Sequence, residues 1–444
     1  MNINVIFVLC TLFLLFSTAS AMNNNKSEIF IELVMQNKTI LRGTQCILSI
    51  SDEKSIKEAK SSLRRFKNEL HGNHVRIFWG PGTGLTSSEW EKLKPNPPPE
   101  FPDCYFWESE AGQIFKKRWL DFFQETGLYV IINMDAGNKF GISKFIRPAS
   151  NAFWTNVWTD DTLRKKVIDN FVSKVTFLKD CPAVIGYDLV NEPIPPGSYE
   201  AKKDGIWAGW QWSDEKATEA GAYADTLARL YNQLITAIRS VDKKNIIILE
   251  PGPFGSSAGF PGLLSVIDDD RLIFSYHHYA PHVFCAANEK AWIKADISMV
   301  KEAPKYPNPD KYRDTPEESF LRAEEFHRAR EEAKKHPCVI FIGEFGTTRF
   351  GDIASQKNWY SETLGRFEKN KWHWAYFLYP ACAEVNWMCF SPFGPEGENV
   401  NIEKEFEYKN QFFKDKEVRE SISKRMNTYR ESFKLVLEYM KRNE

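Results

Sequence analysis

Eight short apolar runs recur along the chain, and segments with helical periodicity separate them. The runs are nearly continuous in β-branched and aromatic residues, which is typical of parallel strands that are buried on both faces. They predict a parallel sheet with strands at residues 39–48, 73–79, 128–134, 183–190, 245–249, 271–277, 338–342 and 373–379.

Between these runs, apolar residues follow the 3.6-residue period of amphipathic helices. One such stripe runs from Leu163 to Val175 and another from Leu227 to Ile238, while a third, over residues 418–433, predicts a C-terminal helix that closes the ring. Strands and helices that alternate eight times predict an α/β fold of the (β/α)8 TIM barrel class. No internal repeat or linker-like tract divides residues 22–444, so we expect a single catalytic domain.

The longest loops follow strands. Residues 80–110, 193–214, 280–315 and 380–414 all leave the carboxyl ends of predicted strands, whereas the helix-to-strand connection at residues 242–244 is short. Barrel enzymes build their active sites from the loops at this end. We therefore expect the functional cleft on this face.

The first residues have the features of a signal peptide. An apolar run from Ile3 to Phe16 precedes Ala19-Ser20-Ala21, which has the small-x-small form of a cleavage site. Residues 1–21 are therefore expected to be removed and the protein secreted; an uncleaved anchor is the alternative, because no Lys or Arg precedes the run. No later run approaches the roughly 20 apolar residues of a membrane span, so no membrane insertion of the mature chain is expected.

Composition narrows the choice of partners. The chain has 58 Lys and Arg residues against 59 Asp and Glu residues, a net charge of -1. This balance offers no positive field for nucleic acid and favours a neutral substrate. There is no CxxC pair, so zinc-finger and thioredoxin sites are excluded, although Cys382 and Cys389 could pair across a loop.

Two carboxylates follow predicted strands four and seven. Glu192 lies in Asn191-Glu192-Pro193 and Glu344 in the segment 343–346, Gly-Glu-Phe-Gly. A single Glu at a strand end is usually an exposed or capping carboxylate. Two of them at one barrel mouth, three strand–helix units apart, instead indicate a functional pair of carboxylates.

These segments, together with Val75-Arg76, Leu41-Arg42-Gly43 and His277-His278-Tyr279, resemble glycoside hydrolase family 5 over nearly the whole mature chain. The resemblance implies a retaining glycosidase with Glu192 as acid/base and Glu344 as nucleophile. It further implies that Asn191 binds the sugar 2-hydroxyl and that Arg76 supports the nucleophile. His277 and Tyr279 are carried over as neighbours of the nucleophile.

Two positions depart from the pattern of the family. Strand three ends in Asn133-Met134-Asp135, where a histidine is customary, so Asp135 is the expected substrate contact there. On strand eight, the tryptophan that stacks under the sugar aligns best with Phe377, with Trp374 or Trp387 as alternatives. The stacking platform is therefore less well defined than the carboxylates.

The chemistry of the pair leads to a hypothesis about protons. Carboxylates about 5 Å apart repel by roughly 3 kcal/mol at an effective dielectric of about 20, so one of them should stay protonated in mild acid. Arg76 beside Glu344 would favour ionisation of that carboxyl and leave Glu192 as the acid.

We therefore expect a monomeric, cellulase-like endo-β-glycanase that acts on an oligo- or polysaccharide and needs no cofactor or metal. β-Mannan and the glycan of a glycosphingolipid are alternative substrates, and an inactive carbohydrate-binding barrel is the alternative of another class. A metal-dependent hydrolase is a weaker rival: His277, His278 and His282 cluster, but no HExxH motif accompanies them. Glu250, at the end of strand five, is expected to be structural or an outer subsite contact.

Overall fold

The computed structural model describes residues 26–79, 82–94, 109–134, 161–193, 214–252, 254–302, 305–308, 315–381, 389–394, 403, 405–407, 409–410 and 428–443. The expected signal segment 1–21, Asp135 and Trp387 lie outside these residues. The expectations for them remain predictions.

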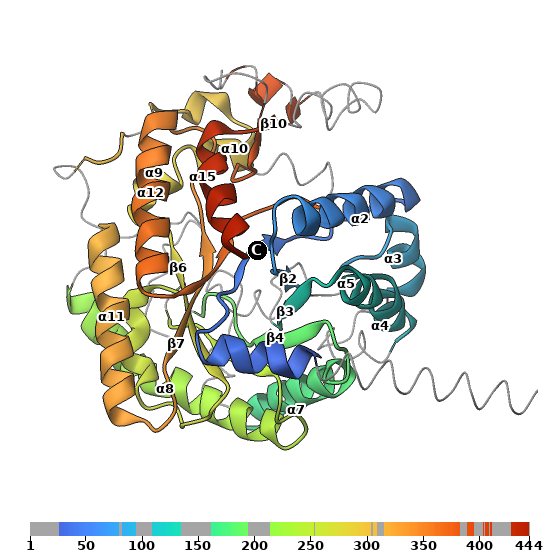
Figure 1. Ribbon diagram of the computed structural model, residues 1–444, viewed down its shortest axis with the longest axis vertical. Helices are drawn as coiled ribbons and strands as arrows, with labels where there is room; N and C mark the ends of the chain where they lie inside the picture. The colour runs from blue at the N-terminus through green and yellow to red at the C-terminus, as the bar shows by residue number, and fades with distance from the viewer. Residues whose placement is uncertain are drawn as a thin grey trace, which may run out of the picture.

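The eight predicted strands form a closed parallel barrel in the order of the sequence (Figure 1). Each strand pairs with its sequence neighbours, and β8 pairs with β1 to close the ring. The TIM-barrel prediction is confirmed. The strands are β1 (Arg42–Cys46), β2 (His74–Phe78), β3 (Tyr129–Asn133), β4 (Val184–Asp188), β5 (Ile246–Leu249), β6 (Leu272–His278), β7 (Val339–Phe345) and β8 (His373–Tyr376).

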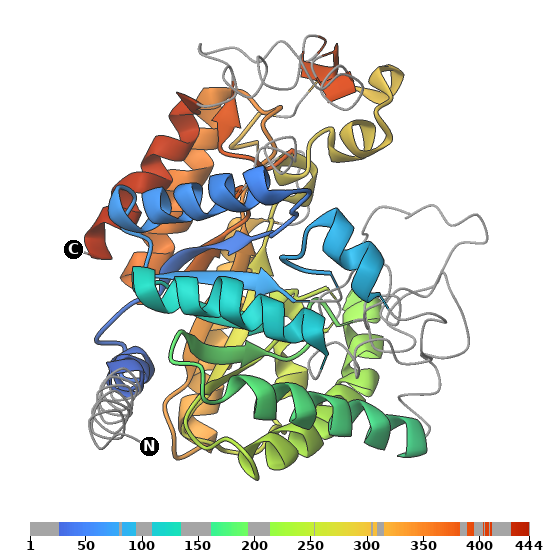
Figure 2. The same cartoon turned by 90° about the vertical axis from the view of Figure 1, so that its right-hand side faces the viewer.

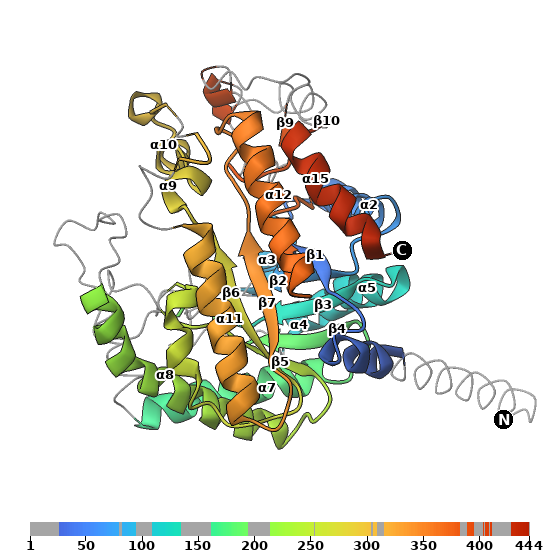
Figure 3. The same ribbon diagram turned by 60° about the vertical axis from the view of Figure 1, so that its left-hand side comes forward.

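Helices surround the barrel and cover its outer surface (Figures 1 and 3). The sequence encodes several of their starts: Asp52 and Ser55 form a reciprocal capping box at α2, and Thr315 caps α11 ahead of Pro316. The helices are α2 (Glu53–Asn68), α3 (Ser87–Leu93), α4 (Glu110–Phe115), the π-helical η2 (Lys116–Leu120), α5 (Asp121–Thr126), α7 (Asp161–Leu178), α8 (Asp214–Arg239), the 3-10 helix η5 (Ser257–Leu263), α9 (His282–Cys285), α10 (Glu289–Lys294), the 3-10 helix η6 (Ile297–Met299), α11 (Pro316–Ala333), α12 (Ile353–Lys369), α15 (Glu431–Met440) and the 3-10 helix η8 (Lys441–Asn443).

The core divides into two parts on either side of the sheet. The larger part lies between the strands and the outer helices. The smaller part fills the bottom of the barrel with residues such as Ile131, Ile248 and Phe341, and Ile31 and Val34 of an N-terminal helix at residues 26–35 pack against it. Figure 2 shows this helix in dark blue at the end where the strands begin. The apolar plug leaves the opposite end of the barrel for polar side chains.

The C-terminal helix differs from the prediction. Thr428–Tyr429 is the short strand β10, which pairs with β9 (Phe393–Gly394), and α15 begins only at Glu431. The apolar period at residues 429 and 433 therefore spans a strand and a helix, while residues 418–427 lie outside the described part.

Cys389 carries a free, buried thiol. Among the described residues, no helix has the length and apolar character needed to cross a membrane.

Candidate active site

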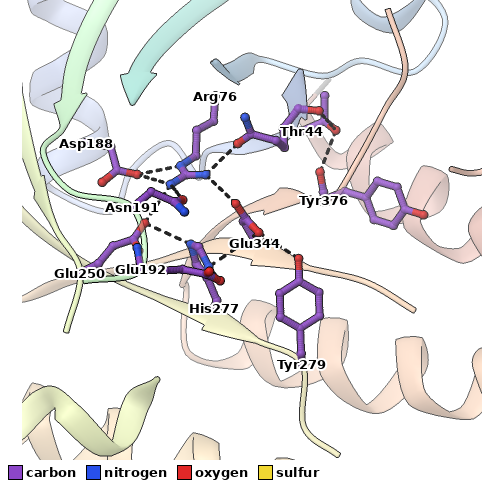
Figure 4. A network of polar contacts seen from close by, with 11 residues as sticks. Thr44, Arg76, Asp188, Asn191, Glu192, Glu250, His277, Tyr279, Glu344 and Tyr376 are labelled. Atoms are coloured by element: carbon purple, nitrogen blue, oxygen red, sulfur yellow. Dashed lines mark hydrogen bonds and ion pairs between the residues drawn. The ribbon is translucent and has the colours of Figure 1, made fainter. Parts of the chain in front are cut away.

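Arg76 of β2 organises the mouth of the barrel (Figure 4). Its guanidinium is fully buried, and its planar fork of donors reaches five side chains that lie on or just after β1, β4, β5 and β7. It donates to Asp188 Oδ2 at 2.7 Å, Gln45 Oε1 at 2.8 Å, Glu344 Oε1 at 2.9 Å, Asn191 Oδ1 at 2.8 Å and Glu250 Oε1 at 2.8 Å. One side chain thus sets the positions of three carboxylates and two amides.

A bulge in β7 turns Glu344 into the mouth. Phe341 faces the barrel interior, so strict alternation would point Glu344 outward and Phe345 inward. Phe345 instead packs in the outer core, which shows that parity changes between the two. The pairing of β7 with both of its neighbours shifts register here, which inserts Gly343 as an extra residue. A Cβ on Gly343 would lie 2.6 Å from Ser275 Oγ, so the bulge packs closely only with glycine.

Glu192 lies just beyond β4, in a tight turn. Its backbone φ is 49°, a left-handed conformation that is uncommon for a residue with a side chain. Its backbone N–H donates to Glu250 Oε2 at 2.7 Å, which holds the turn. The Glu192 side chain is 31% exposed, so it reaches the cleft while Glu344 beside it is nearly buried.

Strand β6 supplies His277, and Tyr279 follows directly after it. The Tyr279 hydroxyl donates to Glu344 Oε2 at 3.0 Å. The His277 Nδ1 atom lies 2.8 Å from Glu192 Oε1 and 3.7 Å from Glu344 Oε2. The sequence predicted both residues as neighbours of Glu344, and the structure places Tyr279 against Glu344 and His277 closer to Glu192.

The carboxylates of Glu192 and Glu344 face each other. One oxygen of each, together with a ring nitrogen of His277, forms a group whose atoms all lie within 4.8 Å of one another. Such a group could hold a metal ion, but both nitrogens of His277 already face carboxylates: Nδ1 faces Glu192, and Nε2 lies 3.1 Å from Glu250. A ring nitrogen that carries a proton has no lone pair for a metal, so the geometry favours a hydrogen-bonded network.

Charge makes His277 the second cation of the site. Burial disfavours its imidazolium, but attraction from Glu250 and Glu344 outweighs burial and raises the pKa of His277 well above its ordinary value. The pKa of Glu250 is lowered to about 2, because attraction and hydrogen bonding from His277 and attraction from Arg76 outweigh burial. Glu250 is therefore an anion that faces two cations.

Two other carboxyls have raised pKa values. Burial, together with repulsion from Glu250, raises the pKa of Asp188 to about 7 against the pull of Arg76. Burial also raises the pKa of Glu344, with repulsion from Glu192 and Glu250 adding to it and His277 and Arg76 opposing it. The sequence predicted that Arg76 would favour the ionised form of Glu344, and Arg76 does lower this pKa. Burial of the carboxyl outweighs that attraction, so the net shift is upward.

Trp374 in β8 and Phe377 directly after it, the two candidate stacking residues in the described part of the chain, occupy different environments. Phe377 is half-buried, and its ring packs edge-on against Tyr279 and Phe390 at the mouth. Trp374 is fully buried in the outer core and packs edge-on against Phe345, with the ring centroids 5.5 Å apart. The prediction that Trp374 contacts substrate was wrong, because successive residues of a strand point to opposite faces and Trp374 faces the helices.

Sequence reasoning missed part of this network. Asp188 and Gln45 were not singled out, and Glu250 was expected to be structural or an outer subsite contact. Glu250 is fully buried beneath Glu192 and His277, so the outer subsite alternative was wrong. An ionisable residue inside an apolar strand, as in Gly186-Tyr187-Asp188, was the available signal, since such a group is costly to bury without a partner.

Comparisons with known proteins agree with this geometry. The family model described as Cellulase (glycosyl hydrolase family 5) matches residues 36–381, which is more than half of the chain. Endoglucanase C of Acetivibrio thermocellus and endoglucanase C307 of Clostridium sp. (strain F1) are each 23% identical over 279 residues, covering 59% of this chain and 70% of the relative.

A solved structure supports the fold. The crystal structure of a glycoside hydrolase superposes with a TM-score of 0.51 at 16% identity, covering 76% of this chain and 88% of that one. At this identity the likeness shows the barrel alone. The family model matches residues 36–381, which include the described residues of the mouth. This chain is a glycoside hydrolase and belongs to glycoside hydrolase family 5.

Proposed function

We propose that the chain is a retaining endo-β-glycanase, with Glu344 as nucleophile and Glu192 as general acid/base. The observation that carries the proposal is the approach of the two carboxylates, whose oxygens come within 4.8 Å. Retaining glycosidases hold their carboxyl groups about 5–5.5 Å apart, whereas inverting enzymes need about 6.5–9.5 Å to admit a water molecule. The spacing found here favours direct attack by a carboxylate.

In the first step, a Glu344 oxygen attacks the anomeric carbon while Glu192 gives its proton to the departing glycosidic oxygen. Arg76 and Tyr279 hold one Glu344 oxygen each and thus fix the attacking group. In the second step, Glu192 takes a proton from water, and the resulting hydroxide displaces Glu344 from the sugar. The two inversions together retain the configuration of the anomeric carbon.

The substrate we propose is a β-linked glucan, in keeping with the names of the endoglucanase relatives. Asn191 is suited to bind the 2-hydroxyl, because Arg76 fixes the orientation of its amide by bonding Oδ1. Phe377 would stack under the sugar, with its ring held in place by Tyr279 and Phe390. Asp135 completes the proposed substrate contacts.

Azide rescue tests the two carboxylate roles separately. On an activated aryl β-glycoside, Glu344→Ala with azide should yield the α-glycosyl azide, because azide then takes the place of the nucleophile. Glu192→Ala should yield the β-azide, because azide then attacks the glycosyl-enzyme in place of activated water. Wild-type enzyme with azide is the control. Full activity in Glu344→Ala, or product of inverted configuration from the wild type, would overturn the assignment.

A substrate panel tests the specificity. β-1,4-Glucan, β-mannan and glycosylceramide should be incubated with the mature protein, and the products separated by chain length. Internal cuts in β-glucan support the proposal, while preference for mannan or glycolipid would select one of the alternative substrates. Binding without turnover of any of the three would instead indicate a carbohydrate-binding barrel.

We also propose that residues 1–21 direct secretion and that the mature enzyme is a monomer. The apolar run from Ile3 to Phe16 and the Ala19-Ser20-Ala21 site support the first proposal. Sequencing of the N-terminus of the secreted protein tests cleavage near Ala21, and sedimentation equilibrium tests the oligomeric state.

A further inference from the structure

Glu250, which follows β5, is a buried anion that the proposed reaction steps do not use. Its side chain is fully buried, and its backbone carbonyl accepts from the Tyr231 hydroxyl at 2.8 Å. No sugar can reach this carboxylate, which excludes a role in substrate binding. Any effect on catalysis must pass through the groups that it contacts.

Those contacts form a closed ring that begins and ends at Glu192. One oxygen of Glu250 accepts the backbone N–H of Glu192 at 2.7 Å. The other lies 3.1 Å from His277 Nε2, and His277 Nδ1 lies 2.8 Å from the carboxylate of Glu192 (Figure 4). Glu250 thus holds Glu192 twice: at its backbone directly, and at its side chain through His277.

A glycine permits this close packing. Gly255 has a φ of 64°, and its carbonyl accepts the backbone N–H of His277 at 2.8 Å. A Cβ at Gly255 would lie 3.2 Å from Glu250 Oε2 and 3.2 Å from Cγ of His277. The loop after β5 therefore packs closely against both Glu250 and His277.

Charged and titratable groups face His277 from every side of the mouth. Glu250 and Glu344 are the main anions that raise its pKa, and Glu192 adds a hydrogen bond that also raises it. Among the described residues, Arg76, Asp188 and Tyr279 are further charged or titratable groups of the mouth, and His282 and Glu289 interact electrostatically with Glu192. Glu250 exerts the largest attraction on His277, so its charge is the main reason why the imidazole of His277 keeps both of its protons.

The protonation of His277 determines where Glu192 can carry its own proton. An imidazolium donates from both nitrogens, so Nδ1–H occupies Glu192 Oε1 and leaves Oε2 to carry the transferable proton. A neutral ring that keeps its Nε2 proton would instead present a lone pair at Nδ1. This lone pair would attract the Glu192 proton to Oε1, away from the leaving group.

We propose that Glu250 is a positioning residue for the acid/base: it keeps His277 a double donor and fixes the turn of Glu192, so that the transferable proton lies on Oε2. This inference rests on the proposed role of Glu192. It adds to the catalytic site a buried anion just after β5, which acts through Glu192 and His277 and does not touch the substrate.

The test replaces Glu250 by Gln and compares it with a matched change at the opposite end of the same strand. Asp242 is also a buried carboxylate, and it accepts from Tyr187 at 2.7 Å, far from the mouth. Asp242→Asn removes the same charge from a purely structural position. Gly255→Ala is a second variant, which displaces Glu250 and His277 without changing any charge.

We expect Glu250→Gln to lower kcat on the order of 100-fold, as expected when a reacting group is misplaced by about 1 Å. Its KM should change little, because the side chain does not reach substrate. The alkaline limb of its pH profile should move to lower pH by about one unit or more, because His277 loses an anionic partner and deprotonates earlier. In ¹⁵N-histidine spectra, the His277 ring should titrate at lower pH in this variant than in the wild type. Gly255→Ala should lower kcat with a smaller shift of the limb.

Asp242→Asn should lower Tm and leave both the profile and the His277 resonance unchanged. If Glu250→Gln merely loses stability while its pH profile and His277 titration match those of the wild type, Glu250 is structural and the inference fails. This failure is distinct from failure of the proposed function, which the azide products of Glu344→Ala and Glu192→Ala report independently.

Discussion

Replacing Arg76 by Met should separate its electrostatic role from its packing role. Methionine fills a similar length but removes the charge and every hydrogen bond of the guanidinium. Arg76 forms ion pairs with Asp188, Glu250 and Glu344 at 2.6 Å, 2.8 Å and 2.9 Å, and its side chain is 0% exposed. Deleting one partner of a buried ion pair costs about 3–5 kcal/mol, because the other charge is left without compensation.

The size of the effect on Tm follows from the length of the chain. Unfolding entropy is about 2.1 cal/mol/K per residue, or about 0.9 kcal/mol/K for a domain of this length, so 1 kcal/mol corresponds to about 1 °C. At neutral pH, Arg76→Met should therefore lower Tm by about 3–6 °C.

The loss should also depend on pH, with a definite sign. Arg76 lowers the pKa of Asp188, Glu250 and Glu344, so its removal raises all three in the folded state. Folded protein then keeps protons that unfolded protein releases above about pH 4. Each such proton makes unfolding easier by about 1.4 kcal/mol per pH unit, until pH passes the folded pKa.

Thermal unfolding followed by circular dichroism at pH 5 and pH 7 measures this dependence. For one proton, the deficit of Arg76→Met should be larger at pH 7 by about 2–3 kcal/mol, or about 2–3 °C. Arg239→Met is the matched control, because the pair of Arg239 with Asp269 lies on the outer layer with 15% and 14% of the side chains exposed. An equal loss of Tm at both pH values would refute the view that Arg76 serves mainly to compensate buried carboxylates.

Three further predictions concern the mouth. Tyr279→Phe should lower kcat by about 10- to 100-fold with little change in Tm, because it removes one charge-assisted hydrogen bond to Glu344, worth about 1.5–3 kcal/mol; steady-state kinetics and calorimetry measure the two effects, and an unchanged kcat would contradict it. Phe377→Ala should raise KM. Trp374→Ala should instead lower the free energy of unfolding by about 3–5 kcal/mol and leave KM unchanged, because Trp374 is fully buried in the outer core. The reverse pattern would restore Trp374 as a substrate contact. The acid limb of kcat/KM should be centred above pH 4.5, the ordinary pKa of a glutamate side chain, because attack needs ionised Glu344 and burial raises its pKa. A limb at or below pH 4.5 would show that the attraction of Arg76 and His277 outweighs burial.

The sequence was sufficient to predict the barrel, because the signal was repeated. Continuous apolar runs occur eight times with helices between them, and few folds bury so many parallel strands on both faces. The C-terminal region lacked such repetition. Tyr429 and Phe433 are spaced like a helical stripe, but one lies in β10 and the other in α15. Two positions with the correct spacing do not distinguish a strand followed by a helix from a continuous helix.

The side-chain errors come from strand parity. Residues 373, 375 and 377 share one face of β8 and its extension, while Trp374 shares the other face with Tyr376. Ala375 packs in the barrel interior, so knowledge of that single contact would have assigned Trp374 to the outer core and Phe377 to the mouth. At β7, alternation gives the wrong face for Glu344, because the bulge at Gly343 reverses parity. Only a family motif could place that carboxylate from sequence.

The missed residues show what sequence spacing cannot supply. Asp188 and Glu250 are 112 and 174 positions from Arg76, and both are isolated acids near strand ends until the barrel closes. With closure, four carboxyls meet two cations: Asp188, Glu192, Glu250 and Glu344 against Arg76 and His277. Full ionisation would leave a net charge of -2 in a largely buried site, which is unfavourable. The raised pKa values of Asp188 and Glu344 are the response to this excess, so the site retains protons at a pH where isolated carboxyls would have lost them. Because attack needs ionised Glu344, the same excess of acids that costs stability also sets a lower pH limit for the proposed first step.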